Sequence, residues 1–279
     1  MTEIIIAFIK LIRPVNFLIT FVSVIVAGII CLNGIFPAQI IFLAALSAAL
    51  TSASGNIIND IFDIEIDKTN RPERPLASKK ISKNSAMAFY LTLILASLTL
   101  AWFINLSAFI IVLTTTIILF IYSKYLKRFT LIGNIVIAFL TGLVFIFGGV
   151  AAENPSAAII PAVFAFLINL IREIVKDIQD VEGDKKAGVT TFPIRYGFKS
   201  SRLLILLLTL LLILFTFFPF ITKLYKIEFF ILVMVIVNPV LVYCLKLLFE
   251  NNSLKNLSKV SNLLKIDMVI GLIAIYFGV

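Results

Sequence analysis

The 279-residue sequence contains no histidine and only two cysteines. The lack of histidine excludes zinc and haem sites that need histidine ligands, and it excludes acid–base catalysis by an imidazole. Cys31 and Cys244 both lie in apolar runs, so we interpret them as buried or lipid-facing residues rather than as a redox pair. Acidic residues are also scarce, with 15 Asp and Glu against 24 Lys and Arg. Clusters of carboxylates are therefore the first candidates for a functional site.

Apolar residues dominate the rest of the chain. They make up 61% of the sequence, and the mean hydropathy is +1.11. This composition predicts an all-α, polytopic membrane protein, a single transmembrane domain over residues 1–279. We expect about nine transmembrane helices, arranged around a central cavity with a pseudo-two-fold repeat. The apolar runs are Phe17–Leu32, Ala38–Ile58, Ala86–Phe103, Ala108–Tyr122, Leu131–Val150, Ala157–Ile171, Leu203–Ile221, Phe229–Phe249 and Leu263–Val279.

The basic residues predict the orientation in the cell membrane. All of the 24 Lys and Arg except Lys223 and Lys226 flank the N-terminus or the connections that follow even-numbered runs. Basic residues accumulate on the cytoplasmic side of membrane proteins. We therefore expect a cytoplasmic N-terminus and a cytoplasmic active site, with active-site loops over about 59–84 and 172–202. The net charge of +9 then comes from these basic loops, and it suits contact with anionic membrane lipids rather than with nucleic acid.

Three carboxylates follow the second apolar run. Asp60, Asp63 and Asp67 have the spacing i, i+3 and i+7, which places them on one helix face together with Asn56, whereas Glu65 points away. At about 5 Å and an effective dielectric near 20, each pair of carboxylates repels by roughly 3 kcal/mol. A solvated helix end is the simple interpretation of such a stripe. A bound divalent cation is the alternative.

The same pattern occurs again after the sixth run, as Asp177, Asp180 and Asp184. Four runs, an even number, separate the two motifs, so both end on the same side of the membrane. An internal repeat of this kind can bring two helix stripes face to face. Six carboxylates without histidine or cysteine favour Mg²⁺, which takes oxygen ligands and is commonly shared with substrate phosphates. We therefore predict a diphosphate between two acidic stripes.

These residues resemble the UbiA superfamily of intramembrane prenyltransferases. Both acidic motifs match the family's aspartate-rich motifs, and two arginine-containing stretches match its flanking signatures. The matching stretches are Asn59-Asp60-x-x-Asp63-x-x-x-Asp67, Asn70-Arg71-Pro72-x-Arg74-Pro75-Leu76, Asp177-x-x-Asp180-x-x-x-Asp184 and Arg13-Pro14-x-Asn16. Family members often carry a Tyr-x-x-x-Lys element after the fourth span. Here Tyr122 and Lys127 are one residue further apart, so Tyr122, Tyr125, Lys124 and Lys127 all remain candidates.

The resemblance implies Mg²⁺-dependent transfer of a prenyl group from its diphosphate. It implies metal binding by the six aspartates, among which Asp60, Asp63, Asp177 and Asp180 are the catalytic candidates. The implied substrate-binding residues are Arg13, Asn16, Asn56, Asn59, Arg71, Arg74, Tyr122, Lys127, Arg172 and Lys185.

The acceptor is less tightly constrained by the sequence. The chain is most similar to archaeal superfamily members that join geranylgeranyl diphosphate to geranylgeranylglyceryl phosphate through an ether bond. That resemblance implies a lipid-phosphate acceptor and no obligate protein partner. An aromatic acceptor of the hydroxybenzoate or quinone type is the alternative within the enzyme class. A cation transporter is the alternative outside it, because acidic residues in membrane segments often mark ion paths.

Overall fold

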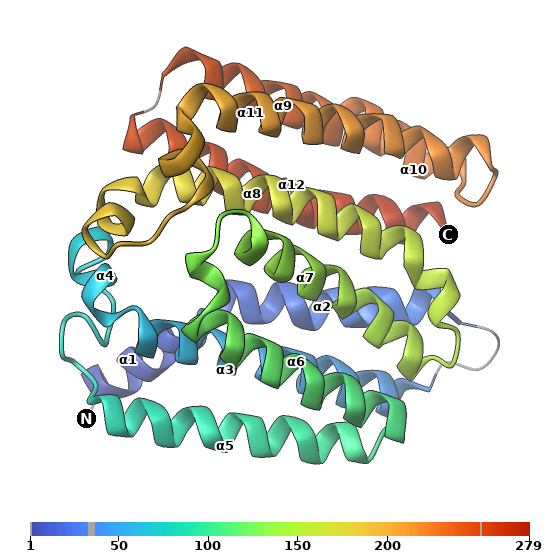
Figure 1. Ribbon diagram of the computed structural model, residues 1–279. Helices are drawn as coiled ribbons and strands as arrows, with labels where there is room; N and C mark the ends of the chain where they lie inside the picture. Colours follow the sequence, from blue (N-terminus) through green and yellow to red (C-terminus); the bar gives the residue numbers. More distant parts are fainter. Residues whose placement is uncertain (1, 33–36, 252) are drawn as a thin grey trace. The chain divides into compact units, whose positions relative to one another are not determined.

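The computed structural model describes residues 2–32, 37–251 and 253–279, and every regular element in these ranges is helical (Figure 1). Eight of the described helices are long and apolar enough to cross a membrane, and the bent pair α1–α2 adds a ninth candidate. This confirms the all-α polytopic fold, whereas the central cavity and the pseudo-two-fold arrangement remain predictions. The elements are α1 (Thr2–Ile12), α2 (Pro14–Ile30), α3 (Ala38–Phe62), α4 (Ile64–Asn70), α5 (Lys83–Trp102), α6 (Leu106–Lys124), η1 (Leu126–Arg128), α7 (Ile132–Ala151), η2 (Pro155–Ala158), α8 (Ile159–Lys186), α9 (Phe192–Ile221), α10 (Ile227–Leu232), η3 (Val233–Val237), α11 (Asn238–Glu250) and α12 (Leu254–Gly278).

Three spans are interrupted at identifiable residues. α1 and α2 meet at an angle of 45°, and Arg13 between them has a left-handed backbone with φ 55°. α9 contains a non-helical residue, Gly197, with φ 79°. The eighth span comprises α10, the π-helical turn η3 and α11. Pro239 follows that turn, and its missing N–H removes one helical hydrogen bond, which explains the wider turn.

The chain divides into two compact units. The first unit comprises Met1–Phe129, Val144–Ala158 and Glu182–Val189, and the second comprises Thr130–Leu143, Ile159–Val181 and Thr190–Val279. Helices α7 and α8 therefore each contribute residues to both units. The single domain expected over residues 1–279 remains a prediction.

Helix α3 is the centre of the first unit and packs against α2, α5 and α6. Its buried side is rich in small residues, including Ala45, Ala49 and Ala53. Gly55 on the same helix allows an especially close approach, because a Cβ there would lie 2.9 Å from Leu119 Cδ1. Small residues let membrane helices approach closely enough to gain van der Waals contact where no hydrophobic driving force exists.

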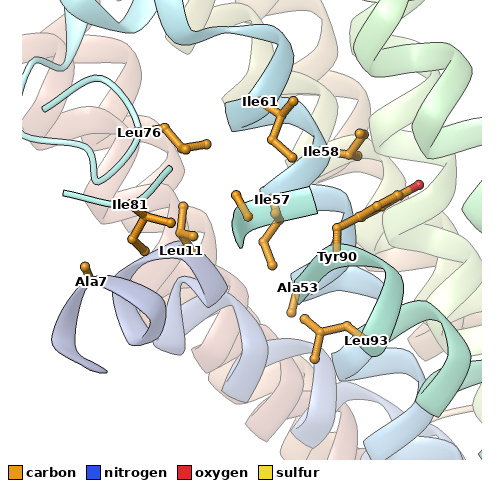
Figure 2. Close-up of a cluster of buried hydrophobic side chains, with 11 residues drawn as sticks. Ala7, Leu11, Ala53, Ile57, Ile58, Ile61, Leu76, Ile81, Tyr90 and Leu93 are labelled. Carbon is orange, nitrogen blue, oxygen red and sulfur yellow. The ribbon is translucent and has the colours of Figure 1, made fainter. Parts of the chain in front are cut away.

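A buried apolar cluster packs around the end of α3 that is predicted to be cytoplasmic (Figure 2). In it, Leu11 of α1 and Leu76 and Ile81 of the segment after α4 gather with Ile57 and Ile61 of α3. The five side chains are each no more than 5% exposed. The segment from Arg71 to Ser82 is thereby held against α1 and α3, although it is not helical. This packing positions the polar residues that immediately precede it.

The second unit contains the last four helices. α12 packs against α10 and α11, and α9 also contacts these two helices. Lys226, before α10, donates a backbone hydrogen bond to Gly278 O at 2.7 Å, which fastens the end of α12 to the start of α10. At the other end, Asn256 Nδ2 donates to Leu247 O at 2.6 Å. The span α10–η3–α11 is thus tied to α12 at both of its ends.

Candidate functional site

The first acidic motif does not lie on one straight helix. α3 ends at Phe62, Asp63 has φ −98° and ψ 8°, and α4 begins at Ile64. The three aspartates are therefore not on a single helix, as the spacing predicted, but at the junction of two. However, the amide of Asp63 still donates to Asn59 O at 2.9 Å, and the amide of Asp67 donates to Asp63 O at 2.8 Å. Because this i, i−4 pattern continues across the break, the three carboxylates keep a common side.

Two arginines neutralise the outer carboxylates of this motif. Arg74 Nη1 lies 2.8 and 2.9 Å from the two carboxylate oxygens of Asp67, and 3.1 Å from Asp60 Oδ1. Arg13, at the bend between α1 and α2, donates to the same oxygen of Asp60. Asp60 and Asp67 are 2% and 4% exposed, so their charges need these partners. The repulsion expected from the sequence is offset here by the protein's own cations.

The middle carboxylate is paired with a lysine from α6–η1. Lys127 Nζ donates to Asp63 Oδ1, and both side chains are mostly buried. Lys124 is instead exposed and lies 4.9 Å from the ring centroid of Tyr125. Among the lysines that could belong to the Tyr-x-x-x-Lys element, Lys127 is therefore the one that reaches the acidic motif. Tyr122, its predicted partner, is half-buried on α6.

Burial and charge oppose one another at Asp67. Burial raises the pKa of its carboxyl group to about 6, although Arg74 acts to lower it. The neighbouring Asp60 and Asp63 add to the rise. Burial also acts to lower the pKa of Arg74, but the attraction of Asp60 and Asp67 outweighs this effect and raises it. Arg74 is therefore held firmly charged, whereas Asp67 titrates close to neutral pH.

The residues of the first motif have the donor chemistry of a magnesium site. Asn59 Nδ2 donates to Asp63 Oδ2 at 2.7 Å, while Asn59 Oδ1 is buried and has no hydrogen-bond partner among the described residues. This oxygen and the carboxylates form the all-oxygen set that Mg²⁺ prefers. In the described ranges, no group of three or more acidic or thiol side chains could hold a metal as it stands. Instead, Arg13, Arg74 and Lys127 are paired with the three carboxylates of the first motif.

Other predicted residues of the first unit surround this cluster. Asn56 Nδ2 donates to Ile12 O at 3.4 Å, which ties α3 to the end of α1. Asn16, in the first turn of α2, and Arg71, directly after α4, are both half-buried. Glu65 points away and pairs at 2.7 Å with Lys68. That pair is well exposed to solvent.

The second acidic motif lies on α8, which remains helical as far as Lys186. Both stretches expected to form active-site loops are thus partly helical. Asp177 accepts a hydrogen bond from Asn134 Nδ2 of α7 at 2.8 Å. The sequence did not predict Asn134, because it is a single polar residue without a repeat partner. Asp180 is half-buried, Asp184 is 9% exposed and Lys185 is exposed.

The end of α8 belongs to the first unit and contacts α4. A Cβ on Gly183 would lie 2.2 to 2.4 Å from the side-chain atoms of Asn70, so a larger residue there requires Asn70 to shift. Asp184 is the next residue. The structure therefore places the last aspartate of the second motif beside the helix that carries Asp67. That Asp177 and Asp180 also face the first motif stays a prediction.

A charged cluster precedes the second motif on α8. Glu173 is 7% exposed and accepts hydrogen bonds from Lys176 Nζ at 2.8 and 2.9 Å. Arg172, predicted to bind substrate, lies 3.5 Å from the same carboxylate. Glu173 and Lys176 were not among the predicted residues. Their helical spacing could have indicated them, because Glu173 and Lys176 fall on the same side of the helix as Asp177.

Comparison with known proteins identifies the family of this chain. Residues 20–266 match the UbiA prenyltransferase family. The chain belongs to this family. A digeranylgeranylglyceryl phosphate synthase of Methanosphaera stadtmanae is 36% identical over 271 residues, which cover 97% of this chain and 98% of the relative. The synthase of Methanocaldococcus jannaschii is 42% identical over 230 residues, with coverage of 81% and 79%.

Solved structures of UbiA proteins have the same fold. One comes from a study of digeranylgeranylglyceryl phosphate synthase in membranes; it is 38% identical, with a TM-score of 0.78, and the match covers 100% of this chain and 99% of the other. A UbiA homolog from Archaeoglobus fulgidus bound to GPP and Mg²⁺ has a TM-score of 0.66 at 21% identity, with coverage of 96% and 99%. The resemblance inferred from the motifs is thus confirmed, and the chain is a multi-pass membrane prenyltransferase.

Proposed function

We propose that this UbiA protein transfers the geranylgeranyl group from geranylgeranyl diphosphate to geranylgeranylglyceryl phosphate. The observation that carries this proposal is the full-length similarity to digeranylgeranylglyceryl phosphate synthases. The reaction forms the second ether bond of an archaeal membrane lipid. In it, the bond between the allylic carbon and the diphosphate oxygen breaks, and the acceptor hydroxyl forms a new C–O bond at that carbon. The hydroxyl proton and the diphosphate are released.

The acidic motifs would hold Mg²⁺ in this reaction. The residues proposed as ligands are Asp60, Asp63, Asp67, Asp177, Asp180 and Asp184. When bound, the metal would neutralise the diphosphate and stabilise its departure. The orphan oxygen of Asn59 supports an added cation at the first motif. A UbiA homolog that binds Mg²⁺ together with GPP supports the same assignment.

The basic residues around the first motif would have a role both in the metal-free site and in the metal-bound site. Arg13, Arg74 and Lys127 hold the carboxylates when no other cation does so. A cation that took over the carboxylates would leave these three side chains next to the leaving diphosphate. They would then orient its outer oxygens by charge-assisted hydrogen bonds. Arg71, Arg172 and Lys185 remain candidates for further contacts with substrate phosphates.

The orientation in the membrane is part of the proposal. The distribution of Lys and Arg supports a cytoplasmic N-terminus and a cytoplasmic site. Both acidic motifs lie at or beyond the ends of apolar segments, where water-soluble diphosphate can leave. The exposed apolar side chains of the spans suit contact with lipid and with prenyl tails.

Two alternatives are less well supported. An aromatic acceptor fits the same metal site, but the relatives at 36% identity over 97% of this chain and at 42% identity over 81% of it carry the name of a lipid synthase. A cation transporter would use acidic residues along a path through the bilayer. Here the acidic clusters lie at helix ends beside arginine and lysine, an arrangement that suits phosphate chemistry better.

The decisive experiment is a product assay with labelled geranylgeranyl diphosphate and one acceptor at a time. We expect an ether product with geranylgeranylglyceryl phosphate and none with hydroxybenzoate or dihydroxynaphthoate. Asp60→Ala and Asp177→Ala should each reduce the rate by at least about 100-fold, and EDTA should stop the reaction until Mg²⁺ is restored. Glu65→Ala is the matched control, because Glu65 lies in the same motif but points away. A product formed only with an aromatic acceptor would contradict the proposal.

A further inference from the structure

The polar face of α8 begins well before the second acidic motif. Asn169, Arg172, Glu173 and Lys176 have the spacing i, i+3, i+4 and i+7, and Asp177 follows directly. These residues lie on one side of a helix that is apolar enough to cross the membrane. Polar side chains in such a segment are unfavourable unless they are paired or serve a function. Their hydrogen bonds therefore need to be accounted for one by one.

Two hydrogen-bond donors on this face have no acceptor among the described residues. Nδ2 of Asn169 and Nε of Arg172 are both buried, and neither has a hydrogen-bond partner in the described parts of the chain. Asn169 as a whole is 5% exposed. The two residues are one helical turn apart on the same side. An amide N–H and a guanidinium N–H can only donate, so the missing partner must be an acceptor.

The charge around these donors favours an anion. The carboxylate of Glu173 is already bonded twice by Lys176 and lies 3.5 Å from Arg172. Glu173 thus faces two cations, and the other carboxylate of this face, Asp177, accepts a hydrogen bond from the neutral amide of Asn134. Arg172 is the cation of this face that has an N–H without a partner in the part of the chain that the structure describes. A phosphate provides the acceptor oxygens that are lacking, and its negative charge suits this guanidinium group.

The position along α8 distinguishes this phosphate from the diphosphate of the donor. Arg172 precedes Asp177 by five residues, and Asn169 precedes Asp177 by eight. These separations correspond to about 7.5 Å and about 12 Å along the helix axis. Because α8 runs towards its acidic end, both residues lie deeper in the apolar segment than Asp177. In a glyceryl phosphate with one prenyl ether, the free hydroxyl is one or two carbons from the phosphate. An acceptor held by Arg172 could therefore present its hydroxyl near the metal-binding end of the helix.

We propose that Asn169 and Arg172 bind the phosphate group of the lipid acceptor and select acceptors that carry it. This inference rests on the proposed function. It assigns to Asn169 a specificity role that the motifs did not indicate, and it moves Arg172 from the diphosphate to the acceptor. Glu173 and Lys176 act as positioning residues, because they fix the guanidinium group without contacting the ligand.

The test compares two acceptors that differ only in the phosphate. The purified full-length protein and the variants Arg172→Gln and Asn169→Leu would be assayed with geranylgeranylglyceryl phosphate and with geranylgeranylglycerol. We expect the wild-type preference for the phosphorylated acceptor, measured as a ratio of kcat/KM values, to fall at least about tenfold in each variant. The KM for geranylgeranyl diphosphate should change less than about twofold. Arg172→Lys, which keeps the charge, should restore part of the preference.

The controls separate this inference from folding and from the proposed function. Asn169→Leu leaves the Arg172–Glu173 ion pair intact, so its effect does not depend on that pair. Lys186→Gln, at the exposed end of the same helix, should leave both the acceptor preference and the KM for geranylgeranyl diphosphate unchanged. A higher KM for the diphosphate with an unchanged acceptor preference would overturn the inference, as would wild-type preference in both variants. If the wild-type protein used no glyceryl phosphate at all, the proposed function itself would be wrong and the inference would fall with it.

Discussion

Arg74 holds the acidic end of α3 together more than any other single side chain of the first motif. It contacts Asp60 and both oxygens of Asp67, and its side chain is only 15% exposed. A buried carboxylate that loses its partner is left with an uncompensated charge, which costs about 3–5 kcal/mol. Arg74 also bonds carboxylate oxygens that we propose as Mg²⁺ ligands. Its removal should therefore have opposite effects on the metal-free and the metal-bound protein.

We predict that Arg74→Gln lowers the thermal midpoint of the metal-free protein and increases the stabilisation by Mg²⁺. The first effect follows from the unpaired carboxylates, and the second from the loss of a competing cation. Thermal unfolding in detergent, with EDTA or with Mg²⁺, measures both. Lys68→Gln is the matched control, because the exposed Lys68–Glu65 pair contributes no more than about 0.5 kcal/mol. Equal Mg²⁺ stabilisation of the variant and the wild type would show that Arg74 does not compete with the metal.

Asp67 makes metal binding sensitive to pH. Its pKa is raised to about 6, chiefly by burial. Above pH 6 the carboxyl group is ionised and Arg74 competes with a metal for it, whereas below pH 6 a proton must also leave. We expect the Mg²⁺ affinity to be constant from pH 8 to about pH 6.5 and then to fall by up to about tenfold per pH unit. Calorimetric titration of Mg²⁺ between pH 5 and pH 8 measures this.

The variant Asp67→Asn identifies the titrating group. It should bind Mg²⁺ more weakly at every pH and lack the change of slope near pH 6. Glu65→Gln should keep that change, because its carboxylate is not part of the cluster. If the slope changed near pH 4 in the wild type, the attraction of Arg74 would outweigh burial at Asp67.

The residues of the first motif could be found from the sequence because they recur at fixed spacing. The aspartates were recognised by their repeat, and Arg13, Arg74 and Lys127 by their signatures. Their pairing with the carboxylates could not be predicted, because it depends on where the segment after α4 packs. Asn134 and Asn169 were missed for a different reason. A single amide in a long apolar run has no periodic pattern to distinguish it from a neutral helix residue.

At the scale of helices, the sequence predicted the spans better than their interruptions. The nine apolar runs correspond to the eight long helices and the bent α1–α2 pair, because hydropathy reports membrane burial directly. The break at Asp63 was not predicted, since the aspartate spacing is the same in a straight helix. The helix α1 was also missed. Its apolar run from Ile4 to Ile9 is too short for a span and ends at Lys10, so it does not stand out as a transmembrane segment.

The contact between α8 and α4 can be tested at Gly183. A methyl group there would overlap the side chain of Asn70, so Gly183→Ala should push the two helices apart. We expect a lower thermal midpoint and a loss of activity of about 100-fold, because an ångström of misplacement can remove that much rate. Gly271→Ala on α12 is the control. Nothing lies within 4 Å of the added carbon there, so this variant should behave as the wild type does.

A double variant shows whether the effect of Gly183→Ala comes from Asn70. In Gly183→Ala with Asn70→Ala, the overlapping amide is gone. The double variant should therefore be less destabilised than the sum of the two single variants, by about 1–3 kcal/mol. Additive effects would mean that the added methyl group acts elsewhere.

At the scale of the whole molecule, the predicted membrane orientation rests on the distribution of Lys and Arg alone. Lys223 and Lys226 are the two basic residues expected outside, and both lie between α9 and α10. Lys80 lies in the segment between α4 and α5, Lys186 is the last residue of α8, and both are exposed. The helices between these positions fix how often the chain crosses the membrane. Lys186 and Lys223 are separated by α9 only, so they should lie on opposite sides.

Single cysteines at these positions can measure this orientation. Cys31 and Cys244 are 0% and 3% exposed, and replacing both with alanine gives a background without thiols. We predict that Lys223→Cys reacts with a membrane-impermeant maleimide in intact cells, whereas Lys80→Cys and Lys186→Cys react only after permeabilisation. This result follows from the positive-inside bias. Labelling of Lys80→Cys in intact cells would place the acidic motifs outside, where the cell offers no pool of prenyl diphosphate, and it would contradict a cytoplasmic active site.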